Sequence, residues 1–229
     1  MAGEDGLAAL EGRPTSVLIA DQLRERIIDG SFRPGEQIRE ASLVEKLQVS
    51  RGPVREALQR LSQEGLLVSH RNRGLFVMEL DEPTIRDIYL ARAAIERTAV
   101  RQAVELGAGS AAEALIEVVE EMRAYEDRPT HPAVSALDMR FHEQLVALSR
   151  SPRLILMHGT LLTQVRLCLA WMQGTYDSVD YRVAEHADIA RAIVAGDGDL
   201  ADRLLCAHMD DGLRRVLASV NGKLSSAGG

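Results

Sequence analysis

The sequence lacks the usual marks of secreted, disulfide-rich and membrane proteins. Only two of its 229 residues are cysteines, Cys168 and Cys206, so no disulfide framework is indicated and a reducing compartment is expected. The first dozen residues carry no basic and apolar signal segment, and no hydrophobic run approaches the length of a membrane span. The sequence therefore predicts a cytoplasmic protein with no membrane partner.

Positive charge is also scarce, because the chain as a whole carries a net charge of −7. Spread evenly, that charge would argue against DNA binding. The spread is uneven: residues 13–79 hold 11 Lys and Arg against 9 Asp and Glu, whereas the remainder holds 16 against 25. The length and the hydrophobic fraction of 46% leave room for two packed domains. We expect a slightly basic domain that approaches DNA and an acidic domain that does not.

Residues 40–59 predict two short helices joined by a tight turn, with one apolar stripe on each helix. The stripes are formed by Leu43, Val44 and Leu47 and then by Val54, Ala57, Leu58 and Leu61. Ser50 is expected to cap the second helix by accepting a bond from a backbone amide one turn on. Arg51 and Arg55 follow on one face of that helix. An arginine pair at a helix start suits phosphate oxygens and the acceptor edge of guanine in a major groove.

Two short strands are predicted after this pair of helices, at residues 66–68 and 75–78. The tip between them is polar, basic and closed by glycine, and its residues Arg71, Arg73 and Gly74 have the chemistry of a wing that lies across a DNA groove. Upstream, residues 16–29 predict an amphipathic helix. This succession predicts an N-terminal winged helix-turn-helix domain over residues 13–79, with the helix-turn-helix at about 40–59.

From residue 81 onward the pattern changes to long helices, and the sequence shows neither a strand signal nor an internal repeat. Gly, Pro, Ser or Asp marks each expected boundary. The expected helices cover residues 81–107, 111–126, 132–149, 152–174, 179–195 and 200–220. Helices of this length with short connections predict an antiparallel six-helix bundle over residues 81–222. The fold class is therefore expected to be mainly α.

The expected bundle contains one pair of residues with metal-ligand spacing. Asp138 and His142 are four residues apart on one helix, so both side chains share a face and can bind one ion. His186 and His208 stand on the last two helices, and a carboxylate with three imidazoles suits zinc, nickel or manganese. Spacing alone also fits histidines satisfied in the core or at the surface, because nothing in the chain forces the last two together. His158 is expected on a helix surface or at an interface.

Residues 27–78 resemble the DNA-binding domain of the GntR family of bacterial transcription regulators. The usual motif of that domain, S-R-T-P-V-R-E-A-L, is matched from Ser50 to Leu58 except at Gly52, where threonine is common. That threonine can touch a phosphate or a base, so the glycine puts one contact in doubt and slightly loosens the first helical turn. The resemblance implies that Ser50, Arg51, Arg55 and the wing residues bind DNA.

Residues 88–216 resemble the helical ligand-binding domain, called FCD, of the FadR subfamily. The resemblance implies one divalent ion per subunit inside the bundle, zinc first and nickel or manganese next. The implied ligands are Asp138, His142, His186 and His208. Arg92 and Glu96 match an R-x-x-x-E pattern in the first helix of that domain, where an arginine can meet the carboxylate of an effector. The alternative interpretation of these two residues is an exposed ion pair between neighbouring helical turns.

Together these resemblances imply a DNA-binding transcription regulator, with repression the commoner arrangement. We expect a homodimer on a palindromic operator, controlled by a small organic or sugar acid at the metal. One alternative is a metal-dependent enzyme with an appended winged helix, since three histidines and a water can generate hydroxide. No recognisable general base, nucleophile elbow or phosphate loop accompanies the ligands, so no catalytic residue is assigned. A second alternative is an architectural protein whose winged helix only binds partners.

Overall fold

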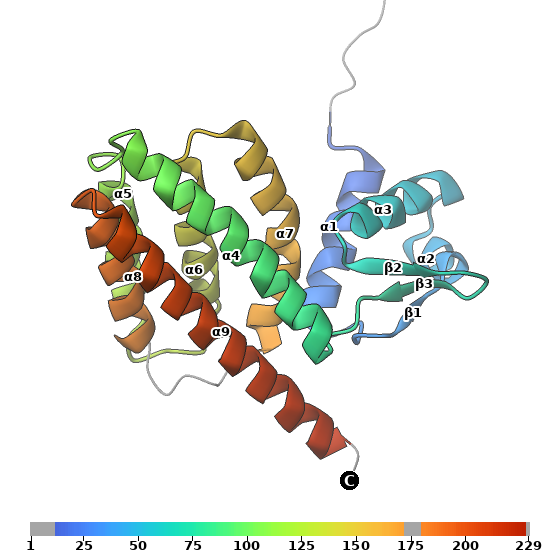
Figure 1. Cartoon of the computed structure of the whole chain (residues 1–229). Coiled ribbons are helices and arrows are strands. Elements are labelled where there is room, and N and C mark those ends of the chain that lie inside the picture. Colours follow the sequence, from blue (N-terminus) through green and yellow to red (C-terminus); the bar gives the residue numbers. More distant parts are fainter. Residues whose placement is uncertain (1–11, 172–179, 228–229) are drawn as a thin grey trace, which may run out of the picture. The chain divides into compact units, whose positions relative to one another are not determined.

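The computed structural model of the chain describes residues 12–171 and 180–227. The chain divides into two compact units, Met1–Val77 and Met78–Gly229. The first unit combines short helices with a small sheet, and the second is built from helices (Figure 1). Each unit has its own buried apolar core.

The first unit contains three helices and three short strands in its described residues. In chain order these are α1 (Thr15–Ile28), β1 (Gln37–Ile38), α2 (Glu40–Leu47), α3 (Arg51–Gln63), β2 (Leu67–His70) and β3 (Gly74–Val77). The sheet is antiparallel with the order β1-β3-β2, and Leu67 pairs with Val77 while His70 pairs with Gly74. Helix α1 packs against α3, and α3 packs against α2 and β2. These contacts build the winged helix-turn-helix that the sequence predicts.

Two backbone features set the direction of the helices in this unit. The turn between α2 and α3 passes through Gln48 in the left-handed conformation, with φ of 52°. At the end of α3, Gly65 has φ of 74°, and the amide of Leu66 donates to the carbonyl of Leu61 at 3.0 Å. This pattern is a glycine cap in which the flanking leucines pack together, and both leucines are fully buried. The predicted glycine stop therefore directs the chain into the wing.

The second unit contains six helices in its described residues. They are α4 (Glu82–Glu105), α5 (Glu113–Arg123), α6 (Pro132–Ala147), α7 (Pro152–Trp171), α8 (Asp180–Val194) and α9 (Gly198–Ala227). Figure 1 shows α4 and α9 running side by side in opposite directions, and α4 also contacts α6 and α7. Helix α8 contacts both α5 and α9. The packing therefore brings α6, α8 and α9, which carry the expected ligands, around one interior.

Local signals explain where two of these helices start. The Asp81 side chain accepts a bond from the amide of Thr84 at 2.9 Å, and the His131 ring accepts from the amide of Ala133 at 3.2 Å. Proline follows at the first or second position of both helices, where no helical partner is lost. Most expected boundaries lie within three residues of those observed, although α9 runs seven residues further than predicted. Positions 172–174 of the predicted fourth helix lie outside the described residues.

None of the helices in the described residues combines the length and the apolar character that crossing a bilayer requires.

Candidate functional site

Helix α3 presents Arg51 and Arg55 to solvent while Val54 and Ala57 are fully buried against the core. The Arg55 side chain is 68% exposed, and its Nε lies 3.1 Å from each carboxylate oxygen of Glu40 on α2. A surface pair of this kind contributes about 0–1 kcal/mol. A phosphate or a base can therefore replace Glu40 as the partner of Arg55 at little cost.

Ser50 occupies the N-cap position of α3 with an extended backbone, but its side chain makes no capping hydrogen bond. The expectation that this hydroxyl caps the helix was wrong. A capping side chain accepts from the second or third helical amide, and the third helical residue here is Pro53, which has no N–H. The exposed Ser50 hydroxyl is therefore not committed to the helix by a capping bond.

The wing is a tight turn between β2 and β3. Gly74 has φ of +98°, which favours glycine, and a Cβ there would lie 3.3 Å from Nε2 of Gln37. Nε2 of Gln37 donates to the carbonyl of Arg73 at 2.6 Å, and the Arg73 guanidinium lies 5.2 Å from the centre of the Phe76 ring. Arg71 is exposed at the tip. The turn thus holds two arginines at the surface, and Gly74 shapes it.

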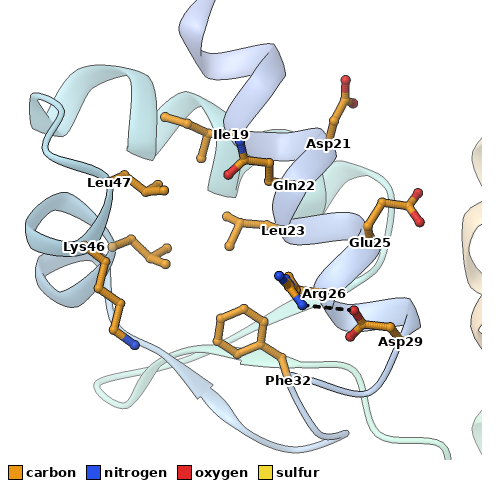
Figure 2. A pocket seen from close by; sticks show the side chains of 11 residues that line it. Ile19, Asp21, Gln22, Leu23, Glu25, Arg26, Asp29, Phe32, Lys46 and Leu47 are labelled. Carbon is orange, nitrogen blue, oxygen red and sulfur yellow. Dashed lines mark hydrogen bonds and ion pairs between the residues drawn. The ribbon is translucent and has the colours of Figure 1, made fainter.

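A groove of about 610 Å³ lies between α1 and α2 in the same unit. Figure 2 shows Leu23, Phe32 and Leu47 pointing into it, with charged side chains such as Asp21 and Glu25 at its rim. None of the residues expected to contact DNA lines this groove. The groove is therefore separate from the candidate DNA-binding residues.

Four buried side chains from three helices converge inside the second unit. Helix α6 contributes Asp138 and His142, α8 contributes His186 and α9 contributes His208. Each offers one atom able to bind a metal, and these atoms all lie within 4.8 Å of one another. The packing of α8 against α9 brings together the two histidines that sequence spacing could not join.

The facing atoms have the separations of ligands that share one ion. Nε2 of His142 lies 3.2 Å from Nε2 of His208, and Nε2 of His186 lies 3.4 Å from Oδ1 of Asp138. Two ligand atoms bound to one tetrahedral zinc at ordinary lengths lie about 3.3–3.4 Å apart. Nε2 of His186 is buried and has no hydrogen-bond partner among the described residues. An orphaned imidazole nitrogen beside a carboxylate fits a bound cation.

Outer partners occupy the other nitrogen of each ring. Nδ1 of His142 lies 2.6 Å from Glu96, and Nδ1 of His208 lies 3.2 Å from Glu185. Nδ1 of His186 lies 2.7 Å from the backbone carbonyl of Arg182. These partners accept hydrogen bonds, so a ring that carries one proton has it on Nδ1 and turns the Nε2 lone pair towards the centre.

Burial keeps the ligands in the forms that bind metal. Burial and the charge of Arg92 lower the pKa of His142 to about 3, and burial and His186 lower the pKa of His208 to about 3. Both rings are therefore neutral at neutral pH. Burial alone would raise the pKa of Asp138, but neighbouring His186 and the charge of Arg182 hold it well below its usual range. The donor set is one carboxylate and three imidazoles, which suits a borderline divalent ion.

Arg92 on α4 is buried rather than exposed. Its Nε donates to Oε1 of Glu96 at 2.8 Å, and the two side chains are 2% and 0% exposed. The alternative of an exposed ion pair is therefore wrong. Nη2 of Arg92 is buried and has no hydrogen-bond partner in the part of the chain that the structure describes. An unsatisfied donor on a buried cation is costly unless an anion meets it.

His158 contradicts the expectation of a surface or interface position. It is 2% exposed, and its Nε2 lies 3.0 Å from Oε1 of Glu96. The residues before it on α7, Leu156 and Met157, are exposed instead. The buried carboxylate needs donors, and this need explains why a histidine rather than an apolar side chain faces inward. No local spacing could reveal the pairing, because 62 residues separate His158 from Glu96.

Comparison with known families gives two matches in succession along the chain. Residues 15–77 match the bacterial regulatory proteins of the gntR family, and residues 87–211, more than half of the chain, match the FCD domain. The chain belongs to the GntR family. The FCD domain fits the FadR subfamily within it. This GntR protein is a transcriptional regulator with a DNA-binding domain followed by an FCD domain.

Individual relatives align along most of this GntR regulator. The Nta operon transcriptional regulator of Aminobacter aminovorans is 29% identical over 85% of this chain and 90% of its own length. The transcriptional repressor RspR of Escherichia coli is 27% identical over 87% of each chain. A solved GntR regulator from Rhodococcus sp. RHA1 is 28% identical, with a TM-score of 0.68 over 89% of this chain and 97% of that one. These relatives are transcriptional regulators and not enzymes, which rejects the enzyme alternative.

Proposed function

We propose that this GntR regulator is a repressor whose operator binding is controlled by a small organic or sugar acid, bound at a metal centre in the second unit. One observation carries the proposal: three imidazoles and a carboxylate converge in a buried interior, with the Nδ1 atom of each ring already engaged by an outer acceptor. The repressor RspR among the relatives supports the sign of the regulation.

One divalent ion per subunit would be held by Asp138, His142, His186 and His208. Zinc suits this donor set best, and nickel and manganese are the alternatives. The ion would supply open coordination positions for a carboxylate of the effector. Arg92 would be the second anchor, because its buried Nη2 has no hydrogen-bond partner in residues 12–171 and 180–227 and a planar guanidinium pairs with a carboxylate in two-pronged fashion.

The DNA-binding domain, residues 13–79, would read a palindromic operator as part of a homodimer formed largely through residues 81–222. Arg51 and Arg55 at the start of α3 would contact bases and phosphates in the major groove. Ser50 would contact the backbone, since its exposed hydroxyl makes no capping bond. The wing residues Arg71, Arg73 and Gly74 would brace the flanking phosphates. Exposure of both arginine pairs and the tight turn at Gly74 support this assignment.

Control requires the effector to prefer one arrangement of the dimer over the other. A ligand that binds both arrangements equally shifts nothing, and couplings between sites are typically about 1–3 kcal/mol, or 5–150-fold. The metal ligands come from α6, α8 and α9, and Arg92 comes from α4. An acid that bridges the ion and Arg92 would therefore favour one mutual position of these helices, and the spacing of the two recognition helices would follow.

Operator binding in the presence of metal and acids tests this function. An operator is first selected from random-sequence duplexes, and its affinity is measured by fluorescence anisotropy with metal-loaded and chelated protein. Acetate, lactate, malate, citrate and gluconate serve as probes. We expect at least one acid to weaken operator binding by metal-loaded protein tenfold or more, with no response after chelation. Arg92→Lys keeps the charge but loses the planar, two-pronged guanidinium, so it should weaken the effect of the acid on operator binding. Equal responses from loaded and chelated protein would reject control through a metal.

A further inference from the structure

Glu96 lies outside the four candidate ligands, yet it is the most enclosed carboxylate near them. The side chain stands on α4 and is 0% exposed. Three donors surround it: Nε of Arg92 at 2.8 Å, Nδ1 of His142 at 2.6 Å and Nε2 of His158 at 3.0 Å. A buried carboxylate that meets a guanidinium and two ring nitrogens is held as a hydrogen-bond acceptor inside the bundle.

The two carboxylate oxygens of Glu96 have different partners. Oε1 receives both Arg92 and His158, and Oε2 receives His142. Two donors from α4 and α7 thus fix one oxygen, and the rigid carboxylate plane then aims the other at the imidazole on α6. The contact to His142 is the shortest of the three. This geometry orients the Glu96 carboxylate towards the ring of His142.

A carboxylate that pairs with a guanidinium accepts hydrogen bonds from its other neighbours. Nδ1 of His142 must therefore carry the proton, which leaves the Nε2 lone pair facing His208 and the centre of the cluster. A metal binds a neutral imidazole through a lone pair, so the opposite tautomer of His142 would present an N–H to the ion. Carboxylates that fix the tautomer of a ligating histidine typically change metal affinity by about 10–100-fold when they are replaced.

We propose that Glu96 is a positioning residue of the metal centre, which fixes the metal-binding tautomer of His142 and is itself held in place by His158 and Arg92. This proposal rests on the metal centre proposed above. It brings α7, which contributes no candidate ligand, into the site through His158. It also places the proposed effector anchor Arg92 and the proposed metal ligand His142 on the same carboxylate. A movement of Arg92 would therefore shift His142.

Glu96→Gln is the direct test, because the amide keeps the shape, loses the charge and can donate to Nδ1 of His142. Zinc affinity is measured by competition with a chromophoric chelator. We expect zinc to bind about 10–100-fold more weakly than to the unaltered chain. Glu185→Gln makes the same change beside His208, where the contact is longer at 3.2 Å and the carboxylate is 15% exposed, so water can replace it. We expect a smaller loss of affinity there.

The tautomer is read directly from the imidazole nitrogen shifts of metal-free, ¹⁵N-labelled protein. We expect the protonated nitrogen of His142 to be Nδ1 in the unaltered chain and Nε2 in Glu96→Gln. A merely structural role for Glu96 would leave that assignment unchanged. Glu96→Asp keeps the charge on a shorter arm and should restore part of the zinc affinity.

The possible outcomes distinguish failure of this proposal from failure of the proposed metal centre on which it rests. If the unaltered chain binds no zinc, nickel or manganese, the metal centre itself is rejected. If it binds zinc and Glu96→Gln binds equally well with the same His142 tautomer, the role of Glu96 is overturned. Should Glu96→Gln fail to fold, His158→Leu decides instead: it removes one anchor of Oε1 and should weaken zinc binding severalfold, and an unchanged affinity would overturn the proposal.

Discussion

Two arginine–glutamate pairs show how differently the two units of this chain use charge. In the winged helix, Arg55 faces Glu40 at the surface, with side chains 68% and 31% exposed. In the bundle, Arg92 faces Glu96 with 2% and 0% exposed. Water screens the first pair, so either partner can be exchanged for a ligand at little cost. Removing one member of the second leaves an uncompensated buried charge, which costs several kcal/mol.

This difference suits the two tasks proposed for the units. A DNA-binding surface must release its internal partners whenever a phosphate arrives, so weak and exposed pairs are an advantage. A sensing interior must hold a metal and an anion in one geometry, so its donors are buried and constrained from outside. Changes in the bundle should therefore act mainly on metal binding and stability, and changes on α3 mainly on DNA affinity.

The largest expected effect comes from removing a buried ligand. At a metal concentration one hundred times the dissociation constant, binding to the folded protein adds about 2.7 kcal/mol of stability. His186→Ala should abolish most of this gain and the response to the effector, while operator binding without effector persists. Thermal unfolding with and without zinc measures the change. His131→Ala, outside the cluster, should keep the full zinc-dependent shift. If His186→Ala keeps it too, or if operator binding also collapses, the separation of tasks fails.

The next effect in size concerns the exposed pair on the winged helix. Arg55→Ala should weaken operator binding by about 1–3 kcal/mol and leave the zinc-dependent melting shift unchanged. Arg60→Ala, at the other end of α3, is the matched control and should have a smaller effect on selected DNA. Anisotropy titrations at two salt concentrations provide the measurement. Operator affinity that stays the same in correctly folded Arg55→Ala protein would remove the start of α3 from the recognition role.

A smaller effect is expected from an ion-pair network whose side chains are partly exposed. The Asp202 carboxylate on α9 accepts from Arg97 at 2.7 Å and from Arg101 at 2.9 Å, both on α4. The hydrogen bond from Arg97 is the main reason that the pKa of Asp202 falls to about 2. Because the folded pKa is lowered, the stabilisation is complete above the unfolded value of about 3.9 and disappears as pH falls through about 2.

Asp202→Asn should therefore lower the free energy of unfolding by about 1 kcal/mol at pH 7, and the difference should vanish near pH 2. Urea unfolding of both proteins across this range measures it. Asp188→Asn disrupts an exposed pair with Arg191 on one helix and should change stability little at any pH. A difference between the Asp202 variant and the unaltered chain that persisted at pH 2 would mean that packing, not charge, is responsible.

Periodicity accounts for how well the fold could be predicted from the sequence. Apolar residues recur at helical spacing in residues 81–222, so the six bundle helices were predicted with most boundaries within three residues, the end of α9 excepted. The two-residue strand β1 was missed, because a strand that short shows no alternation. The Ser50 cap was wrong because the rule considers the capping residue and not whether the third helical residue, Pro53, still has a donor.

The candidate site was harder to predict from the spacing of residues along the sequence. Asp138 and His142 share a helix face, so their spacing alone places them together. His186 and His208 could be joined to them only by resemblance to the FCD domain. Glu96 was recognised only as a partner of Arg92, and His158 was expected in a different environment. Their contacts cross 46 and 62 residues of sequence, and the cost of an unpaired buried carboxylate, which brings them together, appears only once the helices are packed.

The smallest expected effect on stability concerns two helical glycines, one in each unit. A Cβ at Gly52, near the start of α3, would meet no atom within 4 Å. A Cβ at Gly212 on α9 would lie 3.1 Å from the ring of Tyr89 on α4. Gly52→Thr should therefore raise the free energy of unfolding by about 0.3 kcal/mol through helix propensity.

Gly212→Ala is the matched change in the bundle. Propensity alone would make it stabilising by about 1 kcal/mol, but the close ring must shift by a few tenths of an ångström in a packed interior. We expect the clash to cancel the gain or reverse it. Urea unfolding of both variants measures the contrast. If Gly212→Ala gains the full propensity value, the contact between α4 and α9 is looser than the structure indicates, and the bundle is as tolerant at this point as the surface of α3.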